Sequence, residues 1–525
     1  MQAMAFAPSP ARKDLSHKDL VHVLNAAADL LDVLGDEEGG FRAAAYRNAA
    51  RSLERLDDSA ADLQHRQFAG IPKVGKGIAA ELMAYLDTGH FAPLDEAAER
   101  VPEGVQGLFA VRGLGPKKVR ALWDAGICSV EQLRAAAASG QLAALKGFGP
   151  KGAAALGEAA RFVLEAQGQF LLSQGVLAAE SVQHALEKAG LGATWAGDLA
   201  RQRDTLVRVD LQATGEPAQW AGALAGLEGW TAGTPTEDGL SGRLEGVPVQ
   251  LQRASAAPAP YPSFAPYDEP EHAGLALPGP ETLITAGDIR GMLHTHSTWS
   301  DGTASLREMV AGVQTLGCDY LGTGDHSQTA AYAGGLTPAR LREYLAEIRA
   351  LQAEGLPILA GAEVDILADG TLDFPDELLA ELDYAVVSVH SNFGLGQAAQ
   401  TERIIRAVRH PLANILGHPT GRLLLRRAPY EVDIDAVLEA CAESGTAAEI
   451  NASPWRLDLR WQDALRWRGR VKFSINTDAH SVAGLRELRY GVMAAQKAGL
   501  TPADVVNCLE MAAFKTWARP AGNGS

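Results

Sequence analysis

The sequence predicts a multidomain protein with an all-α N-terminal region, a small α+β middle domain and a C-terminal (β/α)7 barrel. Its 525 residues are more than one hydrophobic core accommodates. Residues 17–165 show helical patterns joined by glycine-rich turns, whereas seven apolar runs between residues 291 and 480 alternate with amphipathic helical stretches. Such alternation produces a parallel sheet, and seven repeats can close it into a barrel. The expected divisions are two helical domains at 1–95 and 96–168, an α+β domain at 169–253, a linker at 254–289 and the barrel domain at 290–525.

The composition is typical of a globular protein. Hydrophobic residues make up 47% and charged residues 21% of the chain, which is ordinary for soluble domains. No apolar run has the length that a bilayer requires, and the opening MQAMAFAPSPARK lacks the apolar core of a signal peptide. We therefore expect a cytoplasmic protein without a membrane partner. The sequence leaves the oligomeric state open.

The charge distribution leaves DNA open as a partner. The formal net charge is −17, which opposes binding to a polyanion. Residues 101–151, however, contain seven Lys and Arg residues against three Asp and Glu residues. A local basic segment is enough to bind a phosphate backbone, so net charge alone excludes nothing.

Three turns of the helical region share one pattern, IPKVGKGIAAEL (71–82), VRGLGPKKVRAL (111–122) and LKGFGPKGAAAL (145–156). A glycine turn lets the backbone approach a ligand closely, and the N–H groups that open the next helix suit a phosphate. One copy would indicate only a packing corner between helices, but three copies favour a repeated task. The turns resemble helix-hairpin-helix motifs, which bind DNA irrespective of its sequence. The expected DNA-binding residues are Lys73, Gly75, Lys76, Gly77, Gly113, Gly115, Lys117, Lys118, Gly147, Gly149 and Lys151.

The pattern changes again in residues 170–253. TLVRVDLQA (205–213) and GVPVQLQRA (246–254) alternate like half-buried strands, with helical stretches before and between them. The Pro- and Ala-rich segment that follows, ASAAPAPYPSFAPYDEPEHAGLALPGP, predicts an extended linker.

Each of the seven predicted strands of the last domain ends in polar residues. The runs are GMLHTH, YLGTGDH, ILAGAEVD, AVVSVH, NILGHP, AAEIN and FSINTDAH. The chemistry of such barrels lies at the carboxyl ends of the strands. A single histidine there is usually a hydrogen-bonded loop residue, but six of the chain's 13 histidines fall at these strand ends.

This concentration predicts a site for several metal ions. Alternate residues of an extended chain point the same way, so His294 and His296 can chelate one ion together, and Asp478 and His480 repeat the spacing. Imidazole and carboxylate without thiolate suit zinc, manganese or iron. The nine candidate ligands suit two or three ions, and they are His294, His296, Asp301, His326, Glu363, His390, His418, Asp478 and His480. Clustered metals hydrolyse phosphate esters by generating hydroxide and neutralising phosphoryl oxygens, so no side chain is needed as a catalytic base.

At this point the motifs are recognisable. Residues 290–515 resemble a PHP domain (polymerase and histidinol phosphatase), through HTHSTWSDG, GTGDHS, GAEVDI, SVHS, GHPTGR and INTDAH. GHPTGRLLLRR and EINASPWRLDLRW resemble the version fused to bacterial X-family DNA polymerases, and FRAAAYRNAARSLERL with the glycine turns resembles that family's amino-terminal and fingers domains. The resemblance implies a distorted (β/α)7 barrel that holds three metals through all nine candidates. It also implies a 3′–5′ exonuclease or a related phosphoesterase.

The palm-like middle domain departs from that family. The resemblance implies carboxylates that hold magnesium, but Arg208 stands at the first aspartate position and Gln250 at the third, and only Asp210 survives. One carboxylate beside an arginine cannot hold two magnesium ions. Asp198 replaces the family's turn serine, and Glu81 stands where its lyase lysine is expected. The simplest expectation for this strand is an Arg208–Asp210 pair, or an arginine that contacts DNA phosphate, rather than a magnesium site.

We therefore expect an X-family polymerase relative, active in DNA repair, whose catalytic centre is the manganese- or zinc-dependent phosphoesterase. Its expected partners are gapped, nicked or single-stranded DNA ends. The main alternative is an active gap-filling polymerase that binds magnesium, with Asp210 catalytic and Asp198 or Asp204 standing in for the missing aspartates. A DNA-binding scaffold with a structural barrel and a small-molecule phosphatase are two further alternatives.

Overall fold

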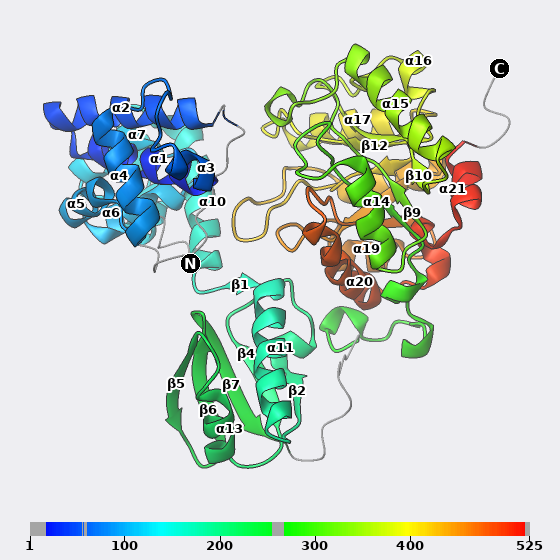
Figure 1. Ribbon diagram of the computed structural model, residues 1–525, viewed down its shortest axis with the longest axis horizontal. Helices are drawn as coiled ribbons and strands as arrows, with labels where there is room; N and C mark the ends of the chain where they lie inside the picture. Colours follow the sequence, from blue (N-terminus) through cyan, green and yellow to red (C-terminus); the bar gives the residue numbers. More distant parts are fainter. Residues whose placement is uncertain (1–16, 55, 57–59, 255–266, 520–525) are drawn as a thin grey trace. The chain divides into compact units, whose positions relative to one another are not determined.

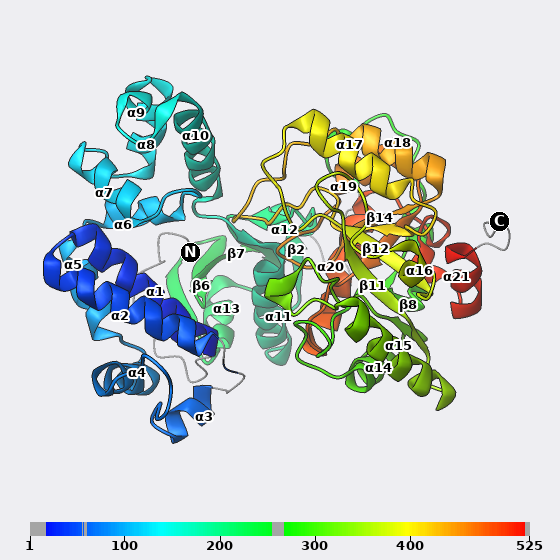
Figure 2. The same cartoon turned by 90° about the horizontal axis from the view of Figure 1, so that it is seen from above.

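The computed structural model describes residues 17–54, 56, 60–254 and 267–519 (Figure 1 and Figure 2). The chain divides into two compact units, Met1–Gln169 and Phe170–Ser525. The opening MQAMAFAPSPARK, and residues 255–266 of the predicted linker, lie outside the described residues. Among the described residues no helix combines the length and apolarity needed to cross a membrane.

The first unit is helical throughout its described residues, as the sequence predicted. Its helices are α1 (His17–Leu34), α2 (Glu37–Leu53), α3 (Ala60–His65), α4 (Lys76–Thr88), α5 (Ala92–Arg100), α6 (Glu103–Gly107), α7 (Pro116–Asp124), α8 (Val130–Ala138), α9 (Gln141–Ala144) and α10 (Gly149–Ala166), with a 3-10 turn η1 (Leu108–Ala110). Apolar side chains from all of them form one core, and α8 lies beside α10 (Figure 2). The predicted glycine turns connect these helices.

The second unit begins with a five-stranded sheet of order β2-β4-β7-β6-β5. These strands are β2 (Ala193–Ala196), β4 (Val209–Ala213), β5 (Trp230–Pro235), β6 (Gly239–Leu244) and β7 (Val247–Arg253), and β1 (Phe170–Leu171) pairs separately with β3 (Thr205–Leu206). The helices are α11 (Leu172–Lys188), α12 (Gly197–Ala200) and α13 (Pro217–Leu224). Figure 1 shows α11 and α13 against the sheet, where Val176 and Trp220 belong to its buried core.

Sequence patterns located only part of this sheet. The predicted strand at 205–213 is interrupted after β3, and β2, β5 and β6 lack a prediction. Most of β5 is exposed, and two glycines interrupt β6, so neither strand carries the apolar alternation that marks a half-buried strand. The composition of these strands therefore does not predict them, and only their hydrogen bonds to neighbouring strands identify them.

The described part of the predicted linker is not extended. It contains three 3-10 turns, η2 (Pro270–His272), η3 (Pro280–Thr282) and η4 (Ala286–Asp288). His272 is buried, its Nε2 lies 2.8 Å from the carbonyl oxygen of Lys497, and its ring packs on Trp461 at 5.0 Å between centroids. The proline-rich composition does not predict this packing, because the packing depends on one buried histidine that anchors the segment to the barrel.

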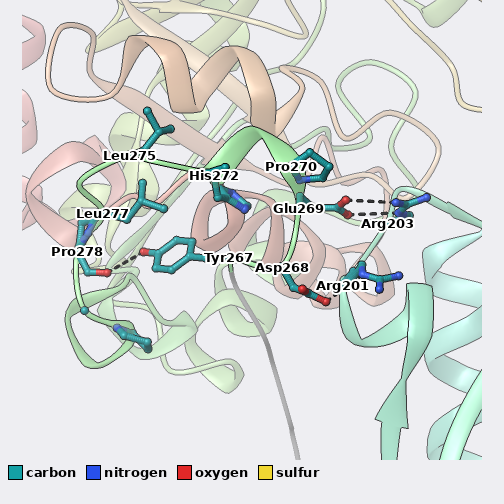
Figure 3. Close-up of a pocket in the computed structure, with 13 residues that line it drawn as sticks. Arg201, Arg203, Tyr267, Asp268, Glu269, Pro270, His272, Leu275, Leu277 and Pro278 are labelled. Atoms are coloured by element: carbon teal, nitrogen blue, oxygen red, sulfur yellow. Dashed lines mark hydrogen bonds and ion pairs between the residues drawn. The ribbon is translucent and has the colours of Figure 1, made fainter.

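The same segment contacts the α+β domain through two ion pairs (Figure 3). Arg201 Nε lies 3.0 Å from Asp268, and the guanidinium of Arg203 lies 3.2 Å from both carboxylate oxygens of Glu269. The buried Lys497 of the barrel domain also approaches Glu269, at 3.4 Å. The α+β domain is therefore fixed to the barrel domain within one compact unit.

The barrel contains all seven predicted strands. They are β8 (Gly291–Leu293), β9 (Tyr320–Gly322), the interrupted run of β10 (Ile358–Leu359) and β11 (Gly361–Asp365), β12 (Tyr384–Ser388), β13 (Ile415–Leu416), β14 (Ala447–Asn451) and β15 (Phe473–Asn476). All pairs are parallel, in the orders β10-β9-β8 and β11-β12-β13-β14-β15. Isolated parallel bridges join Thr295 to Ala479 and His326 to Glu363, which connects the two sheets at both junctions. The result is a distorted (β/α)7 barrel.

Helices surround the strands (Figure 2). They are α14 (Leu306–Thr315), α15 (Pro338–Ala353), α16 (Asp376–Leu379), α17 (Gln397–Val408), α18 (Ile434–Ser444), α19 (Trp461–Trp467), α20 (Leu488–Lys497) and α21 (Met511–Ala518), with 3-10 turns η5 (Ala331–Ala333), η6 (Ala483–Glu487), η7 (Pro502–Asp504) and η8 (Val506–Cys508). Alternate strand residues face opposite ways. Strand residues that face outward pack against the helices in the largest core. Strand residues that face inward fill the barrel, where Tyr384 packs edge-on against Phe514. The polar strand ends are thereby left to form a site at the carboxyl rim.

Candidate metal centre

Glu363, on β11, is the centre of the cluster that the strand ends build. Its carboxylate oxygens lie 2.9 Å from Nε2 of His418, 3.0 Å from Nδ1 of His326 and 3.3 Å from Nε2 of both His294 and His390. The four imidazoles come from the ends of four different strands, β8, β9, β12 and β13. One buried carboxylate therefore gathers ligands that are distant in sequence.

The remaining candidates extend the cluster to one side. Nε2 of His296 lies 3.0 Å from Asp478. Oδ1 of Asp301, in the loop before α14, lies 3.3 Å from His480, 3.7 Å from His326 and 3.8 Å from His296. All nine residues singled out by the sequence thus lie in one continuous constellation.

Three overlapping groups within the described residues have ligand atoms that all lie within 4.8 Å of one another. They are His296, Asp301, His326 and His480, then His294, His296 and Glu363, then His326, Glu363 and His390. Glu363 and two of the imidazoles each belong to two groups, which is the arrangement that closely spaced, carboxylate-bridged ions require. The donors are oxygen and nitrogen, as zinc and manganese accept.

Unsatisfied atoms provide a test of whether metal fits here. Among the described residues, the buried His294 Nε2, His296 Nδ1, His326 Nδ1, His418 Nδ1 and Glu363 Oε2 have no hydrogen-bond partner. His326 Nδ1 and Glu363 Oε2 are only 3.0 Å apart yet are not aligned for a hydrogen bond. Buried polar atoms are rarely left without a partner. Four of these five atoms belong to residues of the three ligand groups, which fits a site for cations.

Residues behind the cluster orient its imidazoles. Glu449 on β14 lies 2.7 Å from Nδ1 of His294 and accepts a hydrogen bond from the backbone N–H of His418 at 2.6 Å. Asp365 lies 3.1 Å from Nδ1 of His390. Such partners fix the ring orientation of metal-binding histidines. The sequence placed both carboxylates at strand ends but assigned them no role, because only the fold shows which ring each one meets.

The backbone is strained at two of the candidate ligands. His418 has a φ of 25° and Asp478 a φ of 54°, in the left-handed region that side chains other than glycine's disfavour. Strain of this kind persists where surrounding contacts enforce it, and it is concentrated at functional sites. His418 is buried, and Asp478 is partly buried with a side chain that is 8% exposed, so packing holds both residues in position.

Electrostatics couple the cluster closely. Burial would raise the pKa of Glu363, but His390 and His294 beside it hold that pKa well below its usual range. Although burial opposes it, Glu363 and Asp365 raise the pKa of His390 to about 10. Burial and the neighbouring rings of His326 and His480 lower the pKa of His296 to about 3. Protons therefore compete with metal for part of this site.

The glycine turns each lead into a helix N-terminus. Gly75 and Gly115 are the N-cap residues of α4 and α7, and the third turn enters α10 at Gly149; none of these N-caps supplies a capping side chain. Gly113 and Gly147 have φ values of 91° and 96°, which only glycine adopts readily. The five lysines singled out by the sequence, Lys73, Lys76, Lys117, Lys118 and Lys151, are exposed. The turns thus present N–H groups and charge to solvent.

The palm-like sheet contains no comparable cluster among its described residues. Asp210 lies opposite Gln250 in the β4–β7 register and pairs with Arg208 at 2.8 Å, as predicted. Asp198 lies 3.2 Å from Arg201. A third nearby aspartate, Asp204, lies 2.8 Å from Arg422 of the barrel domain. Glu81, at the predicted lyase position, accepts hydrogen bonds from the Tyr46 hydroxyl at 3.0 and 3.1 Å.

Comparisons with known families agree with both units. A helix-hairpin-helix domain model matches residues 16–91, a SAM-like helix-hairpin-helix tandem matches residues 105–161, and a PHP domain model matches residues 292–453. The PHP match begins within β8, the strand that His294 and His296 follow.

Individual relatives divide into two kinds. The DNA polymerase/3′-5′ exonuclease PolX of Bacillus subtilis is 32% identical over 562 aligned residues, which cover 93% of this chain and 97% of that protein. Probable phosphatases of Syntrophotalea carbinolica and of a Thermoanaerobacter species are 27% and 28% identical, over 41% of this chain and 90% and 88% of their own lengths. The first kind covers 93% of the chain and the second 41% of it.

Proposed function

Since this chain belongs to the family of bacterial X-family DNA polymerases with a C-terminal PHP domain, we propose that it is a metal-dependent 3′–5′ exonuclease that trims DNA ends during repair. The family makes it a DNA-binding, polymerase-like protein with a PHP phosphoesterase domain. The observation that carries the proposal is the cluster around Glu363 with its unpartnered buried ligand atoms.

The nine clustered residues would hold two or three ions of manganese or zinc. When bound, such ions neutralise phosphoryl oxygens and make water a stronger acid, which is the chemistry that phosphodiester hydrolysis needs. The protein's own contribution is positional. Glu363 gathers the imidazoles, and Glu449 and Asp365 fix the rings of His294 and His390. No side chain is required as the general base.

The helix-hairpin-helix turns would hold the DNA, whose gapped, nicked or single-stranded ends are the proposed substrates. Contacts from backbone N–H groups and lysines to phosphate are independent of sequence and release counterions. A fragment of residues 1–165 should therefore bind unrelated sequences equally, with an affinity that falls by about a hundredfold or more between 50 and 200 mM salt. Sequence-dependent binding, or no binding at low salt, would contradict this part of the proposal.

The alternative of an active, magnesium-dependent polymerase has the B. subtilis relative in its favour, because the name of that protein includes both activities. The described palm-like residues speak against it. Asp210 is paired with Arg208, and Asp198 and Asp204 are also paired with arginines. We therefore place catalysis in the barrel alone.

A single assay tests the proposal. The purified protein is incubated with 5′-labelled single-stranded and gapped DNA in manganese, zinc or magnesium, with and without dNTPs. Stepwise shortening of the labelled strand in manganese or zinc supports a 3′–5′ exonuclease. Elemental analysis should find two or three ions per chain, and fewer than one would contradict the metal centre. If a phosphate monoester is cleaved and DNA is not, the protein acts like the probable phosphatases instead.

A further inference from the structure

Two neighbouring loops beside the metal cluster are rich in arginine. We call residues 418–427, which follow β13, and 452–457, which follow β14, the arginine rim. The rim contains four arginines and no aspartate or glutamate, in a chain whose net charge is −17. A local positive potential of this kind attracts a polyanion in spite of the overall charge. The four are Arg422, Arg426, Arg427 and Arg456.

The rim is in direct contact with the candidate metal centre. The first loop begins at His418, a candidate ligand, and Nε of Arg456 in the second loop lies 3.4 Å from Asp478, another candidate. The side chain of Arg456 is 18% exposed, so part of it faces outward. A planar guanidinium with five donors suits a phosphate group. Arg456 is therefore placed where the backbone of a bound strand would pass.

An aromatic platform lies next to this arginine. Trp455 is 38% exposed, and the guanidinium of Arg426 lies 3.6 Å from the centroid of its ring. An exposed ring beside a phosphate-binding group is the combination on which single-stranded nucleic acid stacks its bases. Arginine on the ring adds a cation–π contribution.

Hydrogen bonds between the two loops hold their conformation. The backbone N–H of Leu424 donates to the carbonyl oxygen of Trp455 at 2.6 Å, and Nε of the buried Arg422 donates to the carbonyl oxygen of Arg456 at 2.9 Å. Leu425 and Leu457, one in each loop, have φ values of 60° and 41°. Surrounding contacts must enforce such conformations.

One of those contacts comes from the palm-like domain. Asp204, just before β3, accepts a hydrogen bond from Nη2 of Arg422 at 2.8 Å, and the two side chains are 21% and 10% exposed. Arginine stays charged, and a buried guanidinium that loses its carboxylate is strongly disfavoured. Asp204 is one of the aspartates that could have served a polymerase. Here it holds the residue that joins the two loops of the rim.

We propose that the arginine rim binds the 3′-terminal segment of single-stranded DNA, with Arg456 on a phosphate and Trp455 under a base, and that Asp204 is a positioning residue for this site. The inference rests on the proposed exonuclease function. It gives the palm-like domain a role that requires no polymerisation, since its aspartate supports the substrate site of the barrel.

The test compares two substrates of the full-length, manganese-loaded protein. One is a 5′-labelled oligo(dT) strand and the other is bis(p-nitrophenyl) phosphate, a small diester without a polynucleotide chain. Trp455→Ala should raise KM for the oligonucleotide about tenfold and leave KM for the small diester unchanged, whereas Trp455→Phe should retain most of the affinity. Leu316→Ala removes an apolar side chain of matched exposure, 39%, at the opposite end of the barrel strands and should change neither value.

A double-mutant cycle tests the positioning role of Asp204. Asp204→Asn should raise KM for the oligonucleotide severalfold at unchanged metal content, and Asp204→Asn combined with Arg422→Gln should cost no more than the worse single variant. The control, Asp268→Asn, breaks a different ion pair of the palm-like domain, that of Arg201, and should have no effect. If Asp204→Asn unfolds, Asp204→Glu, which keeps the charge, should retain the parental KM.

The outcomes separate the two proposals. A parent that cleaves both substrates, together with an unchanged KM for the oligonucleotide in Trp455→Ala, overturns the arginine rim and leaves the exonuclease intact. Equal effects of Asp204→Asn and Asp268→Asn overturn the positioning role. A metal-loaded parent that cleaves neither substrate overturns the proposed function itself.

Discussion

The barrel and the palm-like sheet both place carboxylates near strand ends, but they surround them with different partners. In the barrel, Glu363 is approached by four imidazoles. In the palm-like sheet, Asp210 is approached by Arg208. An imidazole nitrogen can give its lone pair to a metal. A guanidinium is always charged, and its nitrogens act only as hydrogen-bond donors. A carboxylate is therefore available to a cation in the barrel and neutralised in the palm-like sheet.

The supporting residues sharpen this difference. Behind the barrel site, Glu449 and Asp365 face imidazoles and leave the opposite ring nitrogens directed at the cluster. In the palm-like domain, Arg201 pairs with both Asp198 and Asp268, and Asp204 with Arg422. In the barrel, the carboxylates behind the ligands orient imidazole rings. In the palm-like domain, the ion pairs Arg201–Asp268 and Asp204–Arg422 join the domain to other parts of the unit.

The largest effect is expected from removing a barrel ligand. Asp478→Ala or His294→Ala should reduce DNA hydrolysis by about a thousandfold or more, since bound metal supplies several kcal/mol of transition-state stabilisation. DNA affinity should stay near the parental value, because the helix-hairpin-helix turns bind independently. Digestion of labelled single-stranded DNA and fluorescence anisotropy measure the two quantities. His410→Ala, in the same domain but outside the cluster, is the control and should stay active. Either ligand variant cutting at the parental rate would refute the assignment.

An intermediate effect is expected from the residue behind the ligands. Glu449→Gln keeps the shape but loses the charge that orients His294, and its amide would face the N–H of His418 or the ring as a donor. Metal affinity should fall by about 10- to 100-fold, as measured by competition with a chromogenic chelator. Glu443→Gln, on the surface of α18 and paired with Arg409, is the matched control. An unchanged metal affinity in Glu449→Gln would mean that metal binding does not depend on the carboxylate behind His294.

The smallest effect is expected in the palm-like sheet. Templated synthesis with magnesium should be little or none, and Asp210→Ala should cause no further loss, because Arg208 occupies the place where a cation would have to bind. Primer extension on gapped DNA measures this, using protein that also carries Asp478→Ala so that degradation does not mask synthesis. Robust extension that disappears in Asp210→Ala would restore the polymerase and remove the contrast between the two regions.

The sequence by itself determined the parts of this protein that follow from local periodicity. Strand ends of a parallel barrel meet at one rim whatever the details, so the pairs His294–His296 and Asp478–His480 could be assigned to one site from their spacing alone. Gly113 and Gly147 indicated tight turns because few other residues adopt their backbone conformation. The Arg208–Asp210 pair was also predicted from the spacing of two residues, although Arg208 lies just before β4 rather than on a strand.

Tertiary structure decided everything that depends on partners distant in the chain. Nothing local indicates that Glu363 would be the residue at which four imidazoles meet, or that Glu449 would orient His294 across 155 residues. The Asp204–Arg422 pair joins residues 218 apart, and the burial of His272 contradicted the extended linker that its composition predicted. Each of these contacts is set by how strands and domains pack, and packing is a property of the whole chain that periodicity does not encode.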